Sequence, residues 1–237
     1  MKILFRVVSC IFSFCISLNT FAALYDKSNG LIYDDVLDIT WLQDANYAQT
    51  SAYDSDGRMT WSQANAWADQ LSYGGYDDWR LPSAKLMNPT TTPCYAYDGS
   101  CDTGSNNTTS ELGHMFYNNL GNLGRYDTNG NYQPGFGVRN SSFTDGNSGA
   151  SVSIVNLQNS YYRFGEEYEP DTYYAWAFGT GTGGQDYDIK DGNYYSWAVH
   201  DGDIGASPVP LPAGIYLFLS GLVGLGLVKS KKKVSLN

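Results

Sequence analysis

The spacing of apolar positions changes along the chain and predicts strands at both ends of its middle region. Residues 31–33 and 37–42 are short apolar segments around a polar turn, and Ser28-Asn29-Gly30 just before them is a hairpin signal. Four later segments alternate or cluster in the same way, at residues 151–157, 173–178, 185–189 and 194–199. We therefore expect short, mostly antiparallel strands early and late in the chain.

Between these strands the apolar period becomes helical. Thr60 and Gln63 have the spacing of a capping box, and Gly74-Gly75 is a stop signal. The residues that fall on one face of this helix are Trp61, Ala64, Ala68 and Leu71. A second helix is expected from about residue 110 to 120. The order of strands, helix, helix and strands predicts an α+β fold for residues 23–208.

The two ends of the chain have targeting patterns. Lys2 and Arg6 precede an apolar segment at 7–18, and cleavage after Ala22 would remove residues 1–22 as a signal peptide. Residues 210–228 are mostly apolar, and as a helix they would extend roughly 28 Å, enough to span a bilayer. The lysines that follow place the tail's end in the cytoplasm and residues 23–208 outside the inner membrane.

The charge of the exported part limits its partners. Residues 23–208 contain 8 basic and 24 acidic residues, which leaves a net charge of −16. Nucleic acids and anionic lipids are bound through clustered Lys and Arg, so neither is an expected partner. The same charge repels acidic polysaccharide unless cations bridge the two.

Two cysteines remain after signal-peptide removal. Cys94 and Cys101 are close in sequence, and an oxidising compartment favours a disulfide between them. A zinc site is the alternative, but His114 is the only nearby histidine.

The composition is rich in aromatic residues, with 20 Tyr and 6 Trp. Aromatic faces stack on sugar rings, although in a β-rich domain most aromatic side chains belong to the core. The candidates for exposed, glycan-binding positions are Tyr173, Tyr174, Trp176, Tyr194 and Tyr195.

The sequence has few motifs for metal binding or catalysis. We therefore expect that the protein is not an enzyme and requires no cofactor. Asp186, Asp188 and Asp191 are candidate calcium ligands on a turn, where clustered Asp is also ordinary turn chemistry. Glu166 and Glu167 are the carboxylates that a secreted hydrolase would use. Both His114, on the expected polar side of a helix, and His200 have structural or surface interpretations. Arg80 is expected to form a half-buried ion pair.

The tail resembles a PEP-CTERM sorting signal in a Val-Pro-Leu-Pro variant. The motif is Val209, Pro210, Leu211 and Pro212, with Leu211 in place of the family's glutamate, followed by the apolar segment and Lys231-Lys232-Lys233. The resemblance implies processing by an exosortase-like protease and delivery to the surface of a Gram-negative bacterium that makes exopolysaccharide.

Residues 24–203 resemble the Lcl C-terminal-like domain family. The most specific piece is Asp78-Trp79-Arg80-Leu81-Pro82, supported by Gly30-Leu31-Ile32-Tyr33-Asp34 and by the closing Tyr194-Tyr195-Ser196-Trp197-Ala198-Val199. His200 stands where the family usually has arginine. The order of helix, Trp-containing loop and late strands is also similar to C-type-lectin-like folds.

These patterns predict an exported cell-surface or exopolysaccharide-matrix protein with weak, calcium-assisted glycan binding. A purely structural matrix component and a secreted hydrolase are the alternatives.

Overall fold

The computed structural model describes residues 23–87 and 94–205. The expected signal peptide at 1–22, the sorting motif at 209–212 and the expected membrane helix at 210–228 lie outside these residues. Within the described ranges, no helix has both the length and the apolar character needed to cross a bilayer.

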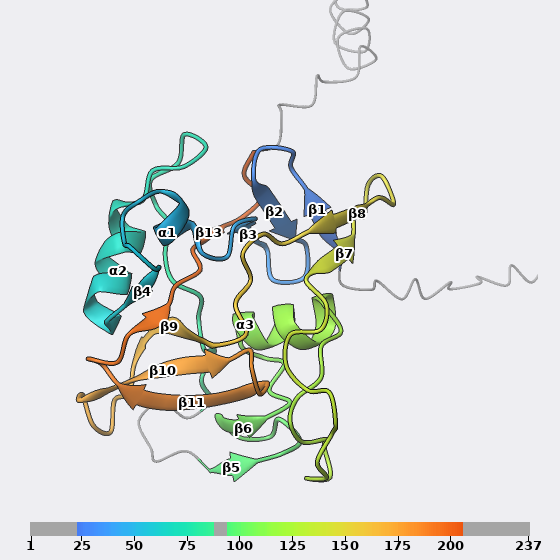
Figure 1. Cartoon of the computed structure of the whole chain (residues 1–237), viewed down its shortest axis with the longest axis vertical. Helices are drawn as coiled ribbons and strands as arrows, with labels where there is room; N and C mark the ends of the chain where they lie inside the picture. The colour runs from blue at the N-terminus through green and yellow to red at the C-terminus, as the bar shows by residue number, and fades with distance from the viewer. Residues whose placement is uncertain (1–22, 88–93, 206–237) are drawn as a thin grey trace, which may run out of the picture.

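A four-stranded antiparallel sheet contains the first and last strands of the described chain (Figure 1). Its order is β1 (Leu24–Asp26), β2 (Leu31–Asp34), β3 (Ile39–Leu42) and β13 (Val199–Asp201). The β1–β2 and β2–β3 pairs are both antiparallel, which confirms the predicted hairpin and the two early strands.

A larger, seven-stranded sheet is built mainly from the later half of the chain and is orange in Figure 1 around β9, β10 and β11. Its order is β4 (Arg58–Met59), β12 (Tyr194–Tyr195), β9 (Tyr161–Glu167), β10 (Tyr174–Gly179), β11 (Gly184–Ile189), β6 (Thr103–Ser105) and β5 (Tyr95–Ala96). Pairing is antiparallel except at β12–β9 and β5–β6. A separate hairpin pairs β7 (Ser142–Thr144) with β8 (Ser151–Ser153).

The longest helix, α2 (Trp61–Gln70), begins with the predicted capping box of Thr60 and Gln63. It buries Ala64, Trp67 and Ala68, whereas Trp61 is only half-buried. The helix ends at Gln70, before the predicted glycine stop, because Leu71 is already extended. A short helix, α1 (Tyr47–Thr50), precedes it.

The second predicted helix is present but is mostly a π-helix. Ser110 caps α3 (Glu111–Gly113), which continues directly into η1 (His114–Asn119). This helical segment contacts both sheets, since Phe116 packs against Phe178 of β10 and Asn119 donates to Asp34 of β2. It is seen between the two sheets in Figure 1.

His114 corrects a prediction. The sequence placed it on the polar side of a helix, but the side chain is buried and its Nε2 lies 3.9 Å from the buried carboxylate of Asp34. The π-helix lies between two sheets, so it has little solvent-facing surface.

The late strands differ from the prediction in two respects. The segment at 194–199 is not one strand: β12 joins the large sheet, β13 joins the small one, and Trp197 between them donates to the carbonyl of Leu42 in the core. The central strand β9 was not predicted, because its buried arginine, Arg163, interrupts the apolar alternation.

One hydrophobic core joins the helices and both main sheets. Its largest fully buried side chains include Trp41, Trp67, Trp176, Trp197, Tyr162, Phe116, Phe164 and Phe178. The fold is α+β and mainly β, as predicted.

Candidate functional site

The strongest candidate site lies at the end of the large sheet where β9 begins and the turn between β10 and β11 closes. Along β9, Tyr162 and Phe164 are fully buried in the core, and strand alternation places Tyr161 on the opposite side. Tyr161 is 43% exposed, which makes it available to a ligand.

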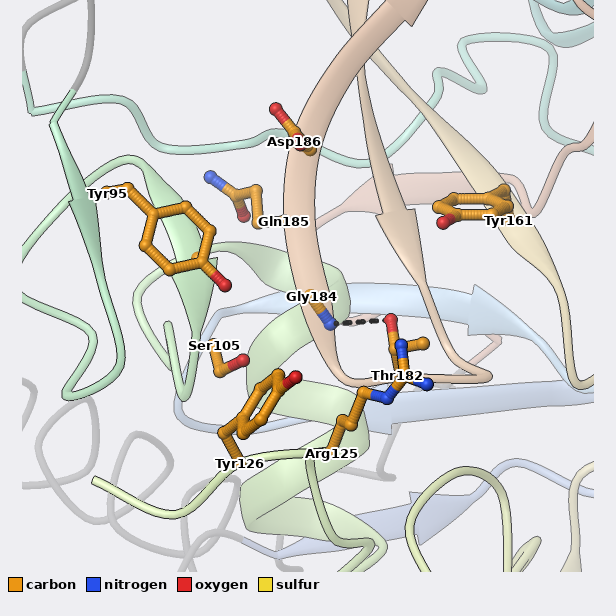
Figure 2. Close-up of a pocket in the computed structure, with 10 residues that line it drawn as sticks. Tyr95, Ser105, Arg125, Tyr126, Tyr161, Thr182, Gly184, Gln185 and Asp186 are labelled. Carbon is orange, nitrogen blue, oxygen red and sulfur yellow. Dashed lines mark hydrogen bonds between the residues drawn. The ribbon is translucent and has the colours of Figure 1, made fainter. Parts of the chain in front are cut away.

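A cavity of about 190 Å³ opens beside Tyr161 (Figure 2). The figure shows Tyr95 and Tyr126 on one side, Tyr161 on the other, and Thr182 and Gly184 between them. Tyr95 is 57% exposed. Three aromatic side chains from separate parts of the chain therefore surround one shallow, open cavity.

Polar groups of the cavity supply acceptors and a cation. Gln185 is almost fully buried, and its Oε1 has no hydrogen-bond partner within the described part of the chain, while its Nε2 donates to the carbonyl of Asp102. The exposed Arg125 lies with its guanidinium over the ring of Phe136. Gln185 Oε1 is itself buried, so the exposed polar groups that a ligand meets in this cavity are those of Arg125 and Asp186.

The cavity also contains the carboxyl group of Asp186. Loss of solvation raises its pKa, and the nearby Asp188 carboxylate raises it further. With Arg125 and Asp186 both present, the local charge of the cavity is close to balanced even though the chain carries a formal net charge of −10.

Tyr161 is held by a layered contact. Its ring packs against Tyr194 with centroids 5.3 Å apart, and the guanidinium of Arg163 lies 4.3 Å from the Tyr194 ring. Arg163 is fully buried and donates to the carbonyls of Ile189 and Gly192. Tyr194 also donates to Asp188 at 2.5 Å. Tyr194 therefore supports the ring of Tyr161, and Arg163 supports Tyr194, so both are positioning residues for Tyr161.

Tyr95 is held by the loop that Cys94 and Cys101 close. These cysteines form the predicted disulfide. The Thr103 hydroxyl donates to the carbonyl of Cys94, and β5 pairs with β6 next to Gly104. Gly104 has φ +121°, and a Cβ there would stand 1.8 Å from a β5 carbonyl oxygen. Only glycine allows this close pairing.

The five predicted glycan-binding residues are not gathered at one place. Trp176 is 1% exposed and belongs to the core, so the expectation that it is exposed was wrong. Tyr174 and Tyr195 are half-buried against core rings. Tyr173 is exposed but does not line the cavity. Tyr194 does not line the cavity either, but its ring packs against Tyr161, which does.

Two of the three predicted calcium ligands are used for other contacts. Asp188 accepts from Tyr194 and Asp186 accepts from its neighbouring amide, whereas Asp191 is exposed on the turn. Within residues 23–87 and 94–205, no three His, Cys, Asp or Glu side chains are grouped as a metal would require.

The Trp-Arg-Leu-Pro motif forms a structural junction. Trp79 and Leu81 are buried, and Asp78 contacts Nε2 of His200 at 2.5 Å. Arg80 exchanges backbone hydrogen bonds with Val199 of β13, and the carbonyl of Pro82 accepts from β9. The motif therefore joins the two sheets.

Arg80 forms the predicted half-buried ion pair, although its partners are distant in sequence. The guanidinium binds the fully buried Glu111 through both carboxylate oxygens, at 2.8 and 3.0 Å, and also binds Asp201. A cavity of about 410 Å³ lies beside this network. Because the charges pair with each other, the network stabilises the fold and leaves few groups for a ligand.

The carboxylates of the hydrolase alternative have internal partners. Glu166 accepts from the Ser83 hydroxyl and from the Ala84 amide, and Glu167 pairs with Lys190. His200, which contacts Asp78, is buried against Tyr76 and Trp79 as a structural side chain.

Sequence reasoning missed most of the cavity. Tyr95, Arg125, Tyr126 and Gln185 were not singled out, since they come from three segments without a shared motif. The turn-rich character around 88–107 and after Leu120 was the one available signal, because binding residues often lie on loops.

Comparison of the chain with protein-family models, with curated proteins and with solved structures gave no match.

Proposed function

We propose that this chain is an exported cell-surface or exopolysaccharide-matrix protein that binds neutral glycan in the cavity between Tyr95, Tyr126 and Tyr161. The observation that carries the proposal is the combination of three tyrosine rings with the exposed polar side chains of Arg125 and Asp186 around one cavity. Sugar rings present apolar faces for stacking and hydroxyls for hydrogen bonds, and the cavity offers a group for each.

Charge favours a neutral glycan. Residues 23–208 carry 24 acidic against 8 basic residues, so a polyanion approaches against repulsion. The cavity itself contains one cation and one carboxyl group, which suits an uncharged ligand rich in hydroxyls.

The test is a glycan-binding measurement on the full-length chain and on Tyr161→Ala. We expect the variant to lose about 1–2 kcal/mol of binding free energy, roughly five- to thirtyfold in affinity. Tyr53→Ala is the matched control, since Tyr53 is 49% exposed and lies outside the cavity. Equal affinity of both variants would refute the assignment of the cavity. No binding to any glycan would favour the purely structural matrix role.

The same measurement in EDTA tests the calcium hypothesis. We expect binding to persist, because the carboxylates of Asp186 and Asp188 are not arranged with a third ligand among the described residues. Loss of binding in EDTA, restored by added calcium, would require a metal at the site.

Binding without catalysis is the activity we propose. Glu166 and Glu167, the carboxylates considered for a hydrolase, are each held by a partner inside the fold. Release of reducing sugar from a neutral polysaccharide by the purified chain would contradict this.

The proposed route to the surface uses the two ends of the chain. Sec export would remove residues 1–22, and an exosortase-like protease would process the tail at or near Val209, after residues 210–228 had held the precursor in the inner membrane. Intact mass and fractionation of wild type and a Pro210→Ala, Pro212→Ala variant test this. A variant that is trimmed and sorted like wild type would refute the sorting role.

We also propose membership of the Lcl C-terminal-like family and a C-type-lectin-like arrangement. The support is that the Trp-Arg-Leu-Pro motif joins both sheets, and that the first and last described strands share one sheet. An experimental structure superposed on lectin-like domains tests the arrangement.

A further inference from the structure

A second cavity adjoins the first one. It measures about 310 Å³ and is lined by Asn159, Ser160, Tyr161, Gly179, Gly181 and Thr182. Tyr161 and Thr182 line both cavities, so the two cavities meet at these residues.

The second cavity has a small-residue floor and a polar rim. Glycines at 179 and 181 leave room that side chains would otherwise fill, since a Cβ on Gly179 would stand 3.0 Å from both Thr182 Oγ1 and the Tyr161 ring. Asn159 and Ser160 are at least partly exposed on the rim. Asn159 Oδ1 accepts from the Val138 amide, which leaves the Asn159 side-chain NH₂ group and the Ser160 hydroxyl for ligand hydroxyls.

The size of the cavities limits what each one holds. The volumes of both cavities are near or below the low end of the range for sites that enclose a drug-sized molecule, which is roughly 300–1,000 Å³. Each therefore suits one ring-sized unit, and two adjoining cavities suit two consecutive units of a chain.

We propose that the two cavities are adjacent subsites for an internal stretch of a linear neutral polysaccharide, with Tyr161 between consecutive sugar residues. This inference rests on the proposed glycan binding and specifies its ligand. A chain bound across Tyr161 would place one sugar residue in each subsite. Recognition of this kind selects polymer over free monosaccharide, because only a polymer fills both subsites.

The experiment is a calorimetric titration of the full-length chain with linear neutral homo-oligosaccharides of glucose, mannose and galactose, from the monosaccharide upward. We expect the affinity to rise about tenfold or more when a second sugar residue is added and to level off soon afterwards. The matched variant is Gly181→Val, which fills only the second cavity. Gly181 has only ordinary contacts at its Cβ position, the nearest being 3.4 Å from the Asn159 carbonyl oxygen.

Gly181→Val is expected to lose the gain in affinity with oligosaccharide length, because the valine side chain occupies the second cavity. A wild-type affinity that is the same for monosaccharide and longer oligomers would overturn the two-subsite inference and leave the proposed function standing. Absence of binding to every oligomer would overturn both. If Gly181→Val misfolds and loses monosaccharide binding too, the wild-type affinities for the monosaccharide and the longer oligomers test the two-subsite inference by themselves.

Discussion

Replacement of Arg80 by methionine removes a polar junction that links Glu111, Asp201 and the carbonyl of Leu81. All five N–H donors of its guanidinium are used: Nε and Nη2 bind Asp201, both Nη groups bind Glu111, and Nη1 also donates to the carbonyl of Leu81. Glu111 is fully buried, whereas Asp201 is largely exposed. The loss of the Glu111 contacts therefore dominates the cost.

The magnitude follows from what stays behind. After the change, the buried Glu111 carboxylate keeps the Ser83 amide and Lys85, whose Nζ is 3.3 Å away and half exposed. Removing one partner of a buried ion pair costs about 3–5 kcal/mol. Because Lys85 remains and Arg80 is 32% exposed, we expect about 3 kcal/mol.

The assay is urea unfolding of the full-length chain, followed by tryptophan fluorescence. Arg58→Met is the matched control, since Arg58 is exposed and its guanidinium donates to a backbone carbonyl, that of Asn193; we expect the change to cost less than about 1 kcal/mol. The Arg80→Met, Glu111→Met double variant is expected to regain part of the loss, because the unpaired charge is gone.

A loss of unfolding free energy in Arg80→Met no larger than that in Arg58→Met would refute this account of the ion pair. A double variant whose loss equals the sum of the Arg80→Met and Glu111→Met losses would refute it too, because the effects of a coupled pair are not additive.

Three further predictions concern the site loops and pH. Gly104→Ala would press a Cβ against the neighbouring β5 carbonyl, so it should weaken both glycan binding and stability. Gly75→Ala has no atom within 4 Å of its new Cβ and should cost about 1–3 kcal/mol of stability for its positive φ alone. Equal effects of the two changes in unfolding and binding assays would argue against the packing account. Replacing Cys94 and Cys101 with serine should cost about 2.5 kcal/mol for the opened loop, and an unchanged unfolding midpoint would contradict that value. Burial and the bond to a neighbouring carboxylate raise the pKa of Tyr194 to about 12, so its stabilising contribution, complete below pH 10, should disappear as the pH rises through 12. Unfolding free energies of wild type and Tyr194→Phe across that range measure it, and parallel curves would refute it.

Features that depend on near neighbours in sequence were predictable. The capping box of Thr60 and Gln63, the early hairpin and the disulfide of Cys94 with Cys101 all join residues within a few positions of each other. Features that depend on burial were not. Trp176 was expected at the surface and is in the core, and His114 was expected on the polar side of a helix and is buried.

Local patterns in the chain specify the α+β class, the turns and caps, and the residue types available for a site. Which of these residues meet depends on how distant segments pack. Glu111 lies 31 residues from Arg80 along the chain and Asp201 lies 121 away, while the cavity brings Tyr95, Tyr126 and Tyr161 together. Sterics and local hydrogen bonds act over a few residues, so they are written in short patterns. Burial and cavities arise where distant segments pack, so no short pattern specifies them.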